Sequence, residues 1–302
     1  MRSIQQTVQR RQRQDRWFRI VGASCTLVGV VTLVALLGNL LLDGLARIDW
    51  NFLSSFPSRR AAAAGILAAL VGSLLVMVVT AVVAVPLGIA AGVYLEEYAP
   101  KNRLLTILEV NIANLAGVPS VVYGLMALGV FVYTFGFGHS IATAGLTLAA
   151  LILPIVIVAT REALRTIPRT IREASYALGA TKWETVRHHL LPYSAGGIST
   201  GIILGLSRAI GETAPLVTIG ALAFIAFLPD PPLTVEFPFV SFDWLGSDFT
   251  VLPIQMFNWV SRPDQASQAN AAATGVVLIA ITLSLNAVAI YVRYRMRRNI
   301  RW

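Results

Sequence analysis

The sequence alternates between long apolar runs and short charged clusters. Uncharged stretches of 35, 51 and 28 residues occupy positions 61–95, 110–160 and 265–292. A helix that crosses a bilayer needs about 20 predominantly apolar residues, so each stretch is long enough for one or two spans. Hydropathy therefore predicts six membrane-spanning helices, near residues 20–42, 65–94, 111–135, 140–160, 197–228 and 271–292.

The composition agrees with a membrane protein. Of the 302 residues, 56% are hydrophobic and 13% are charged, whereas about 25% are charged in an ordinary soluble domain. The net charge of +9 first suggests a nucleic-acid partner. A nucleic-acid binder, however, gathers its Lys and Arg on a polar face, and the mean hydropathy here is +0.70. We therefore expect one multi-span domain over residues 1–302, in a lipid bilayer and with no nucleic-acid partner.

The basic residues are distributed unevenly between the two sides of the predicted membrane. Nineteen of the 24 lie in the N-terminal segment, the 95–110 loop, the 161–196 loop and the C-terminal segment. Four lie on the opposite side, and Arg208 lies inside a span. Cytoplasmic loops carry an excess of Lys and Arg, so this bias predicts that both termini are cytoplasmic. We expect the 20–42 run to be an uncleaved first helix, because it is longer than the apolar region of a signal peptide.

Several kinds of chemistry are excluded by what the sequence lacks. The single cysteine, Cys25, cannot build a disulfide framework or a cysteine-based metal site. Neither of the two lysines, Lys101 and Lys182, follows a glycine, so the phosphate-binding P-loop is absent. We expect no catalytic residue, no cofactor and no metal. If ATP drives this protein, another subunit supplies the ATPase.

The connection between the fourth and fifth predicted spans has the pattern of two short amphipathic helices. Pro168 suits the first turn of a helix, and Gly179 suits the left-handed residue that ends one. Thr181 and Glu184 form a capping box that opens the second helix, and Pro192 is expected to end it. From the pattern alone, a pair of helices lying on the lipid surface remains an alternative.

This connection carries a family motif. Residues 173–192 read EASYALGATKWETVRHHLLP, which resembles the EAA loop of ABC-importer permeases (E-A-A, three residues, G, nine residues, I-x-L-P). Two positions depart from that pattern, Ser175 and His189. In the family, the loop docks into a groove of a cytoplasmic ATPase. The resemblance implies that the coupling residues of this chain are Glu173, Ala174 and Gly179.

The fifth predicted span holds a charged pair, Arg208 and Glu212. At 100° per residue, the pair shares a stripe with Gly197, Gly201 and Gly205, so it should face protein or a pore rather than lipid. In one interpretation, Arg208 offers transient positive charge to a passing oxyanion and Glu212 limits how tightly that anion binds. In the other, the two side chains form an ion pair that lowers the cost of membrane insertion. Helical geometry leaves both open.

The same region shows a narrower resemblance. Residues 207–216 read SRAIGETAPL, which is similar to the R-A-x-G-E-T-A-P-L signature of phosphate-importer permeases of the PstA type. Residues 85–98 and 114–124 are similar to further segments of that family. The resemblance implies an all-α bacterial inner-membrane permease with the MetI-like fold and alternating access. It assigns Arg208 and Glu212 to the path of inorganic phosphate. It also implies three partners: a PstC-like permease, two copies of a PstB-like ATPase and a PstS-like phosphate-binding protein.

Alternatives remain for the function and for weaker signals. A permease for sulfate or molybdate, and a membrane scaffold that senses phosphate without moving it, are the main ones. A channel or secondary transporter is disfavoured by the EAA loop. We expect Glu96 and Glu97 to be solvated and Gly88 and Gly92 to serve helix packing. The aromatic loop 229–270 is expected to lie at the outer interface, where it either touches a binding protein or anchors in lipid.

Overall fold

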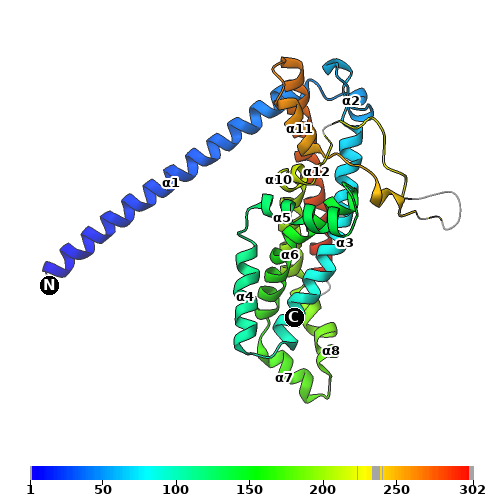
Figure 1. Ribbon diagram of the computed structural model, residues 1–302. Helices are drawn as coiled ribbons and strands as arrows, with labels where there is room; N and C mark the ends of the chain where they lie inside the picture. The colour runs from blue at the N-terminus through cyan, green and yellow to red at the C-terminus, as the bar shows by residue number, and fades with distance from the viewer. Residues whose placement is uncertain (1, 223, 233–238, 240, 299–302) are drawn as a thin grey trace.

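The computed structural model describes residues 2–222, 224–232, 239 and 241–298. These residues form helices joined by short connections, and their only β-type pairing is an isolated bridge between Ser140 and Asp248. The elements, seen in Figure 1, are α1 (Arg2–Leu45), α2 (Trp50–Ser54), η1 (Ala61–Ala63), α3 (Leu67–Val93), η2 (Tyr94–Tyr98), α4 (Arg103–Leu115), α5 (Ser120–Ala127), η3 (Leu128–Thr134), α6 (Ile141–Arg165), α7 (Arg169–Ala177), α8 (Lys182–Thr185), η4 (Val186–Leu190), α9 (Leu191–Ile210), α10 (Ala214–Thr218), η5 (Asp243–Gly246), α11 (Leu252–Val260) and α12 (Gln265–Arg298).

The described helices reproduce most of the predicted spans. Five of them are long and apolar enough to cross a membrane: Gln14–Leu45, Leu67–Tyr98, Ile141–Arg165, Lys182–Ile210 and Gln265–Arg295. A sixth crossing is possible only if the bent pair Arg103–Leu115 and Ser120–Thr134 counts as one. The all-α membrane fold is therefore confirmed.

Helices α3 and α6 form the centre of the bundle and run in the same direction. A Cβ added at Gly88 would lie 2.6 Å from Val156, and one added at Gly92 would lie 2.7 Å from Thr160. Both positions thus require glycine because the two helices approach too closely for any side chain. The prediction that Gly88 and Gly92 serve helix packing is confirmed.

Helix α9 packs against the other side of α6 and runs antiparallel to it. A Cβ at Gly197 would lie 2.6 Å from that of Ala163, and a Cβ at Gly201 would overlap that of Ala159. The glycine stripe predicted on the fifth span therefore faces α6, so it is a helix-packing surface.

Helix α1 leaves the bundle. Only its last turns contact other elements, where a Cβ at Gly44 would lie 2.8 Å from the backbone of Ala272 in α12. The remaining length extends away from the other helices (Figure 1), and none of its most apolar window is buried. The side chain of Arg47 fastens the base of α1, since its Nε donates to Oδ1 of the buried Asn270 at 2.8 Å.

The third predicted span, 111–135, is not one straight helix. Helices α4 and α5 meet at an angle of 103°. The bend follows from Pro119, whose extended backbone precedes the first residue of α5 and which disfavours the helical conformation in the residue before it. The hydroxyl of Tyr123 stabilises the bend by donating to the carbonyl of Leu115 at 2.9 Å.

The helix that carries the fifth predicted span, 197–228, begins and ends at other residues than that span. The helix starts at Lys182 and passes through Pro192, which we expected to end it. The wider π-turn of η4 lies directly before this proline and can relieve the clash between a proline ring and the carbonyl of residue i−4. At its other end the helix stops at Ile210, before Gly211. The chain then forms only the short α10, and residue 223 lies outside the described residues.

Candidate functional site

The predicted charge pair is formed at the end of α9. Nε of Arg208 lies 3.2 Å from Oε1 of Glu212, and the two side chains are 39% and 18% exposed. Because the helix ends at Ile210, Glu212 is held beyond its last turn, where its N–H donates to the carbonyl of Ala209 at 3.2 Å. The pair thus joins the last turn of α9 to the break that follows it.

The guanidinium of Arg208 is only partly used. Within the described part of the chain, Nε is the sole nitrogen of this side chain with a hydrogen-bond or ion-pair partner. Both Nη groups are therefore left to bind an anion through the planar fork of donors that suits an oxyanion. At 39% exposed, the side chain is only partly covered by this chain.

Two interrupted helices meet next to this pair. Helix α10, which follows the break in α9, packs against α5, which follows the bend after α4. A Cβ added at Gly124 of α5 would lie 2.7 Å from Cα of Pro215 and would overlap Oγ1 of Thr218. Non-helical backbone at membrane depth is tolerated where it is buried in protein or lines an aqueous cavity. Sequence reasoning missed this arrangement, because hydropathy averaged over a window does not respond to a break of three or four residues between apolar segments.

The connection between α6 and α9 is shorter than predicted, because Arg161–Arg165 belong to α6 and residues 191–196 to α9. Its turn follows the prediction closely. Gly179 has φ of +86° and ends α7. The capping box at the start of α8 is present, with the N–H of Thr181 donating to Oε2 of Glu184 at 2.7 Å. Helix α7 begins at Arg169, directly after Pro168.

Helix α7 is amphipathic, as its pattern predicted, but its less polar face is only partly buried. Ser175 is buried, but Ala174 and Leu178 are exposed, the latter at 90%. Trp183 on α8 is also exposed, at 56%. Glu173 is also exposed and lies with Arg169 and Tyr176 on the side of α7 that lines a cavity below η2 and α4. The tip of the connection therefore presents apolar side chains that no other part of the described chain covers.

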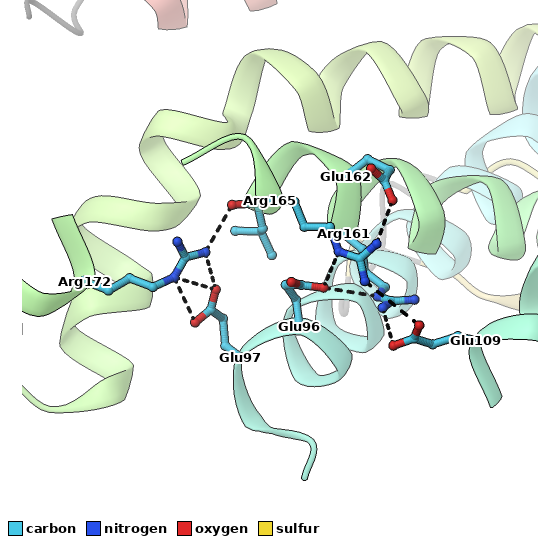
Figure 2. A network of polar contacts seen from close by, with 8 residues as sticks. Glu96, Glu97, Glu109, Arg161, Glu162, Arg165 and Arg172 are labelled. Carbon is cyan, nitrogen blue, oxygen red and sulfur yellow. Dashed lines mark hydrogen bonds and ion pairs between the residues drawn. The ribbon is translucent and has the colours of Figure 1, made fainter. Parts of the chain in front are cut away.

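An ion-pair network at the same end of the bundle was not predicted (Figure 2). Glu96 lies 2.9 Å from Nε of Arg165 and 3.5 Å from Nε of Arg161, both on α6. Nη2 of Arg161 also pairs with Glu109 of α4. The side chain of Arg161 is only 8% exposed, so the network supplies the compensation that a buried charge needs.

Glu97 belongs to a second part of the network. Its carboxylate accepts from Nη2 of Arg172 at 2.7 Å and from Nε at 3.1 Å. The side chain of Glu97 is 9% exposed, so the expectation that Glu96 and Glu97 are solvated is wrong. The sequence contained one signal for this pairing. Acidic and basic residues occur at the ends of predicted spans that lie on the same side of the membrane.

A polar seam joins α9 to α12. Oγ of Ser207 donates to Oδ1 of Asn286 at 2.6 Å, and Nη1 of Arg293 donates to Oγ1 of Thr200 at 2.8 Å. These two contacts fix the register of the antiparallel helices. Ser207 is the neighbour of Arg208, so the seam also holds the end of α9 in place.

These features define a helical membrane protein with a charge pair at the end of a candidate membrane span and a structured loop at one end of the bundle. Residues 84–302 match the family described as "binding-protein-dependent transport system inner membrane component", and the chain belongs to this family. It is therefore an ABC-importer permease of the MetI type.

The curated relatives are consistent with this assignment. The phosphate transport system permease protein PstA of Mycobacterium leprae is 34% identical over 282 residues, covering 90% of this chain and 86% of that protein. PstA 1 of Mycobacterium tuberculosis strain H37Rv is 33% identical over 239 residues, covering 79% and 73%. The probable ABC transporter permease YqgI of Bacillus subtilis is 34% identical and covers 69% of each chain. The resemblance to PstA-type permeases is confirmed.

A solved structure supports the fold. A chain of the inward-facing MetNI methionine ABC transporter superposes with a TM-score of 0.53 at 18% identity, covering 76% of this chain and 95% of that one. The MetI-like fold is confirmed.

Proposed function

We propose that this chain is the transmembrane permease subunit of an ATP-driven importer of inorganic phosphate. The observation that carries the proposal is the Arg208–Glu212 pair, which lies at the break of a membrane helix with both Nη groups of the arginine unused by the described chain. Its support is the similarity to PstA permeases over most of the chain.

Arg208 is proposed to receive the phosphate oxygens as they pass the break in α9. Charge-assisted bonds from a guanidinium to an oxyanion are short and commonly bidentate. Glu212 occupies one edge of the guanidinium at 3.2 Å, so its negative charge offsets part of the attraction. An anion can then leave as readily as it arrives, which transport requires.

Glu212 also supports phosphate over sulfate or molybdate. Near neutral pH inorganic phosphate keeps at least one proton, whereas sulfate has none. An ionised carboxylate is only an acceptor, so it gains a hydrogen bond from a protonated phosphate and repels an oxyanion without a donor. This difference favours phosphate among the candidate oxyanions.

The connection formed by α7 and α8 is proposed to bind a partner ATPase. Its exposed apolar side chains, Leu178 and Trp183, have no cover within the described chain. Glu173, Ala174 and Gly179, which match the coupling motif, lie on or beside this surface. Placing this end in the cytoplasm agrees with the excess of Lys and Arg on its side, and it makes both termini cytoplasmic.

The complete transporter is proposed to contain this permease, a PstC-like permease, two PstB-like ATPases and a PstS-like binding protein, in the bacterial inner membrane. When the ATPases close on ATP, α7 and α8 move with them, and the permease pair opens outward to receive phosphate. After hydrolysis the pair opens inward, and phosphate leaves past Arg208. Residues 1–302 act in this cycle as one transmembrane domain.

Uptake of radiolabelled phosphate into vesicles that contain all four components tests the proposal. ATP-dependent uptake is expected in the wild type. It should fall by at least about 10-fold in Arg208→Gln, since one charge-assisted contact is worth about 1.5–3 kcal/mol. The matched control is Arg59→Gln, because Arg59 lies outside the candidate spans.

Competition by sulfate separates the oxyanion alternatives. Sulfate at equal concentration should not reduce phosphate uptake in the wild type, and it should compete better in Glu212→Gln. Sulfate uptake without phosphate uptake would identify a permease for a different oxyanion. Binding of phosphate that changes ATPase activity without any uptake would instead identify a sensing scaffold.

A further inference from the structure

Arg172 joins α7 to two other elements at once. Its Nη2 and Nε donate to Glu97 on η2, at 2.7 and 3.1 Å. Its Nη1 donates to the carbonyl of Ile167 at 2.9 Å, and Nη2 also reaches the carbonyl of Leu164 at 3.1 Å. All three guanidinium nitrogens are therefore used, and each of the groups that they contact lies outside α7.

The chemistry of these contacts favours a rigid link. The carbonyls at the C-terminal end of a helix carry partial negative charge and attract a cation. The carbonyl of Leu164 accepts from Arg172 in addition to the N–H of Ile167, which donates to it at 3.2 Å. The bidentate pair with Glu97 fixes the plane of the guanidinium. The side chains are 17% and 9% exposed, so solvent screens this pair far less than a surface ion pair.

Glu97 also contacts the second helix of the connection. Its backbone carbonyl accepts from Nζ of Lys182 at 3.4 Å, and this ammonium lies 5.8 Å from the ring centroid of Tyr98. In the described part of the chain, every polar contact between α7–α8 and the α3–η2 rod involves Glu97 or Tyr98. One turn of π-helix therefore holds both helices of the connection.

The neighbouring residue, Glu96, points the other way. It pairs with Arg161 and Arg165 of α6, while Glu97 points to Arg172 (Figure 2). Two successive glutamates thus fasten the end of α3 to α6 on one side and to α7 on the other. Both glutamates lie in the π-turn η2, directly after the end of α3. Successive side chains of a helix point in different directions, so Glu96 reaches α6 and Glu97 reaches α7.

We infer that Glu97 and Arg172 are positioning residues that make the α7–α8 connection move as one body with α3 and α6. This inference rests on the proposed function, in which α7 and α8 receive the motion of an ATPase. Without the link, α7 would keep its covalent ends, the packing of Ile171 against Leu164 and its neighbours, and the contact of Ser175 with Thr185 of α8, none of which joins it to η2. Motion at the tip would then be lost before it reached α3.

The first test measures coupling, as phosphate imported per ATP hydrolysed in the four-component vesicles. Glu97→Gln should lower this ratio by at least about fivefold, the lower end of typical coupling effects, while ATP hydrolysis continues. Glu162→Gln is the matched control, because Glu162 pairs with Arg165 at 3.0 Å in the same region but is 63% exposed. A wild-type ratio in Glu97→Gln would overturn the inference.

The second test restores the link covalently. Cys25, the only cysteine, is replaced by serine, and Glu97→Cys and Arg172→Cys are then joined by a reducible bis-methanethiosulfonate cross-linker. We expect low coupling before cross-linking, recovery after it and loss again on reduction. If Glu97 and Arg172 were needed only for folding, cross-linking and reduction would not restore and remove coupling reversibly. Cross-linked protein that remains uncoupled would show that α7 must separate from η2, and this too contradicts the inference.

A third measurement does not depend on the transported substrate. Amide hydrogen exchange across α7, followed in the assembled complex, should be at least about 10-fold faster in Glu97→Gln than in Glu162→Gln, because local opening no longer breaks a buried pair. If wild-type vesicles import no phosphate, the proposed function fails. The hydrogen-exchange comparison still tests the link between Glu97 and Arg172. Equal exchange in the two variants would then refute the link itself.

Discussion

Ser175 of α7 and Thr185 of α8 hold their hydroxyl oxygens 2.9 Å apart inside the connection that follows α6. Both side chains are buried. This contact closes the L formed by the two short helices, and it explains why a small residue stands at position 175.

The effect of replacing Ser175 should therefore depend steeply on the size of the new side chain. In Ser175→Ala, Thr185 keeps its bond to the carbonyl of Thr181 at 3.0 Å, so we expect a cost of about 1 kcal/mol and nearly normal ATPase binding. Ser175→Leu cannot fit between the helices and should abolish co-purification of the ATPase. Equal co-purification of the two variants would contradict this packing.

Whether a substitution at Gly179 is tolerated should depend on how readily the new residue adopts a positive φ, not on the size of its side chain. No atom lies within 4 Å of a Cβ built there, but φ is +86°. Gly179→Asn should lose less coupled transport than Gly179→Val, because asparagine adopts the left-handed region far more readily. The control is Gly136→Val, at a position with φ of +70° and equally open surroundings that precedes the start of α6, whereas Gly179 follows its other end. It should leave ATPase stimulation unchanged.

Gly201→Val should weaken the contact between α9 and α6. The new side chain would overlap Ala159, and overpacking of this kind typically costs about 1–3 kcal/mol. Thermal unfolding in detergent measures the effect. Gly29→Ala, on the part of α1 where nothing lies within 4 Å, should leave the unfolding temperature unchanged or slightly raised. An equal loss in both variants would mean that the helices do not approach at Gly201.

Arg161 should matter more for stability than Arg165, although both pair with Glu96. The side chain of Arg161 is 8% exposed and that of Arg165 is 42% exposed. Arg161→Gln removes the buried member of the network and its charge-assisted contacts with Glu96 and Glu109, so it should cost about 1.5–3 kcal/mol. Arg165→Gln should cost about 1 kcal/mol or less. Comparing the yields and unfolding temperatures of the two proteins checks the order.

Tyr123→Phe should destabilise the bend between α4 and α5. The lost hydroxyl donates to the part-buried carbonyl of Leu115 at 2.9 Å, and a hydrogen bond of this kind contributes about 0.5–1.5 kcal/mol to stability. Tyr133→Phe is the control, because that ring is 72% exposed. If the two substitutions have the same effect on unfolding, the hydroxyl does not stabilise the bend.

Features that depend on neighbouring residues in the sequence were predicted correctly. The left-handed conformation of Gly179 follows from its place after an amphipathic pattern, and the Thr181–Glu184 capping box follows from a spacing of three. The Arg208–Glu212 contact follows from a spacing of four. Each of these features depends only on residue types and on their spacing along the chain.

Several features that depend on tertiary contacts were not predicted, although the close packing at Gly88 and Gly92 was. The bend at Pro119 and the continuation of the helix through Pro192 are opposite outcomes for the same residue type in apolar surroundings. What separates them is the π-turn of η4 in one case and the Tyr123 hydroxyl in the other. The pairing of Glu97 with Arg172 joins residues 75 positions apart, and only the packing of α3 beside α6 brings them together.

The free length of α1 has a geometric consequence. The 32 residues from Gln14 to Leu45 form a rod about 48 Å long at 1.5 Å per residue, attached at one end near Gly44. Rotating such a rod by about 5° at its base displaces the other end by about 4 Å. The contacts at Gly44 and Arg47 therefore set its direction only coarsely, and whatever lies along its exposed length in the membrane determines its final angle.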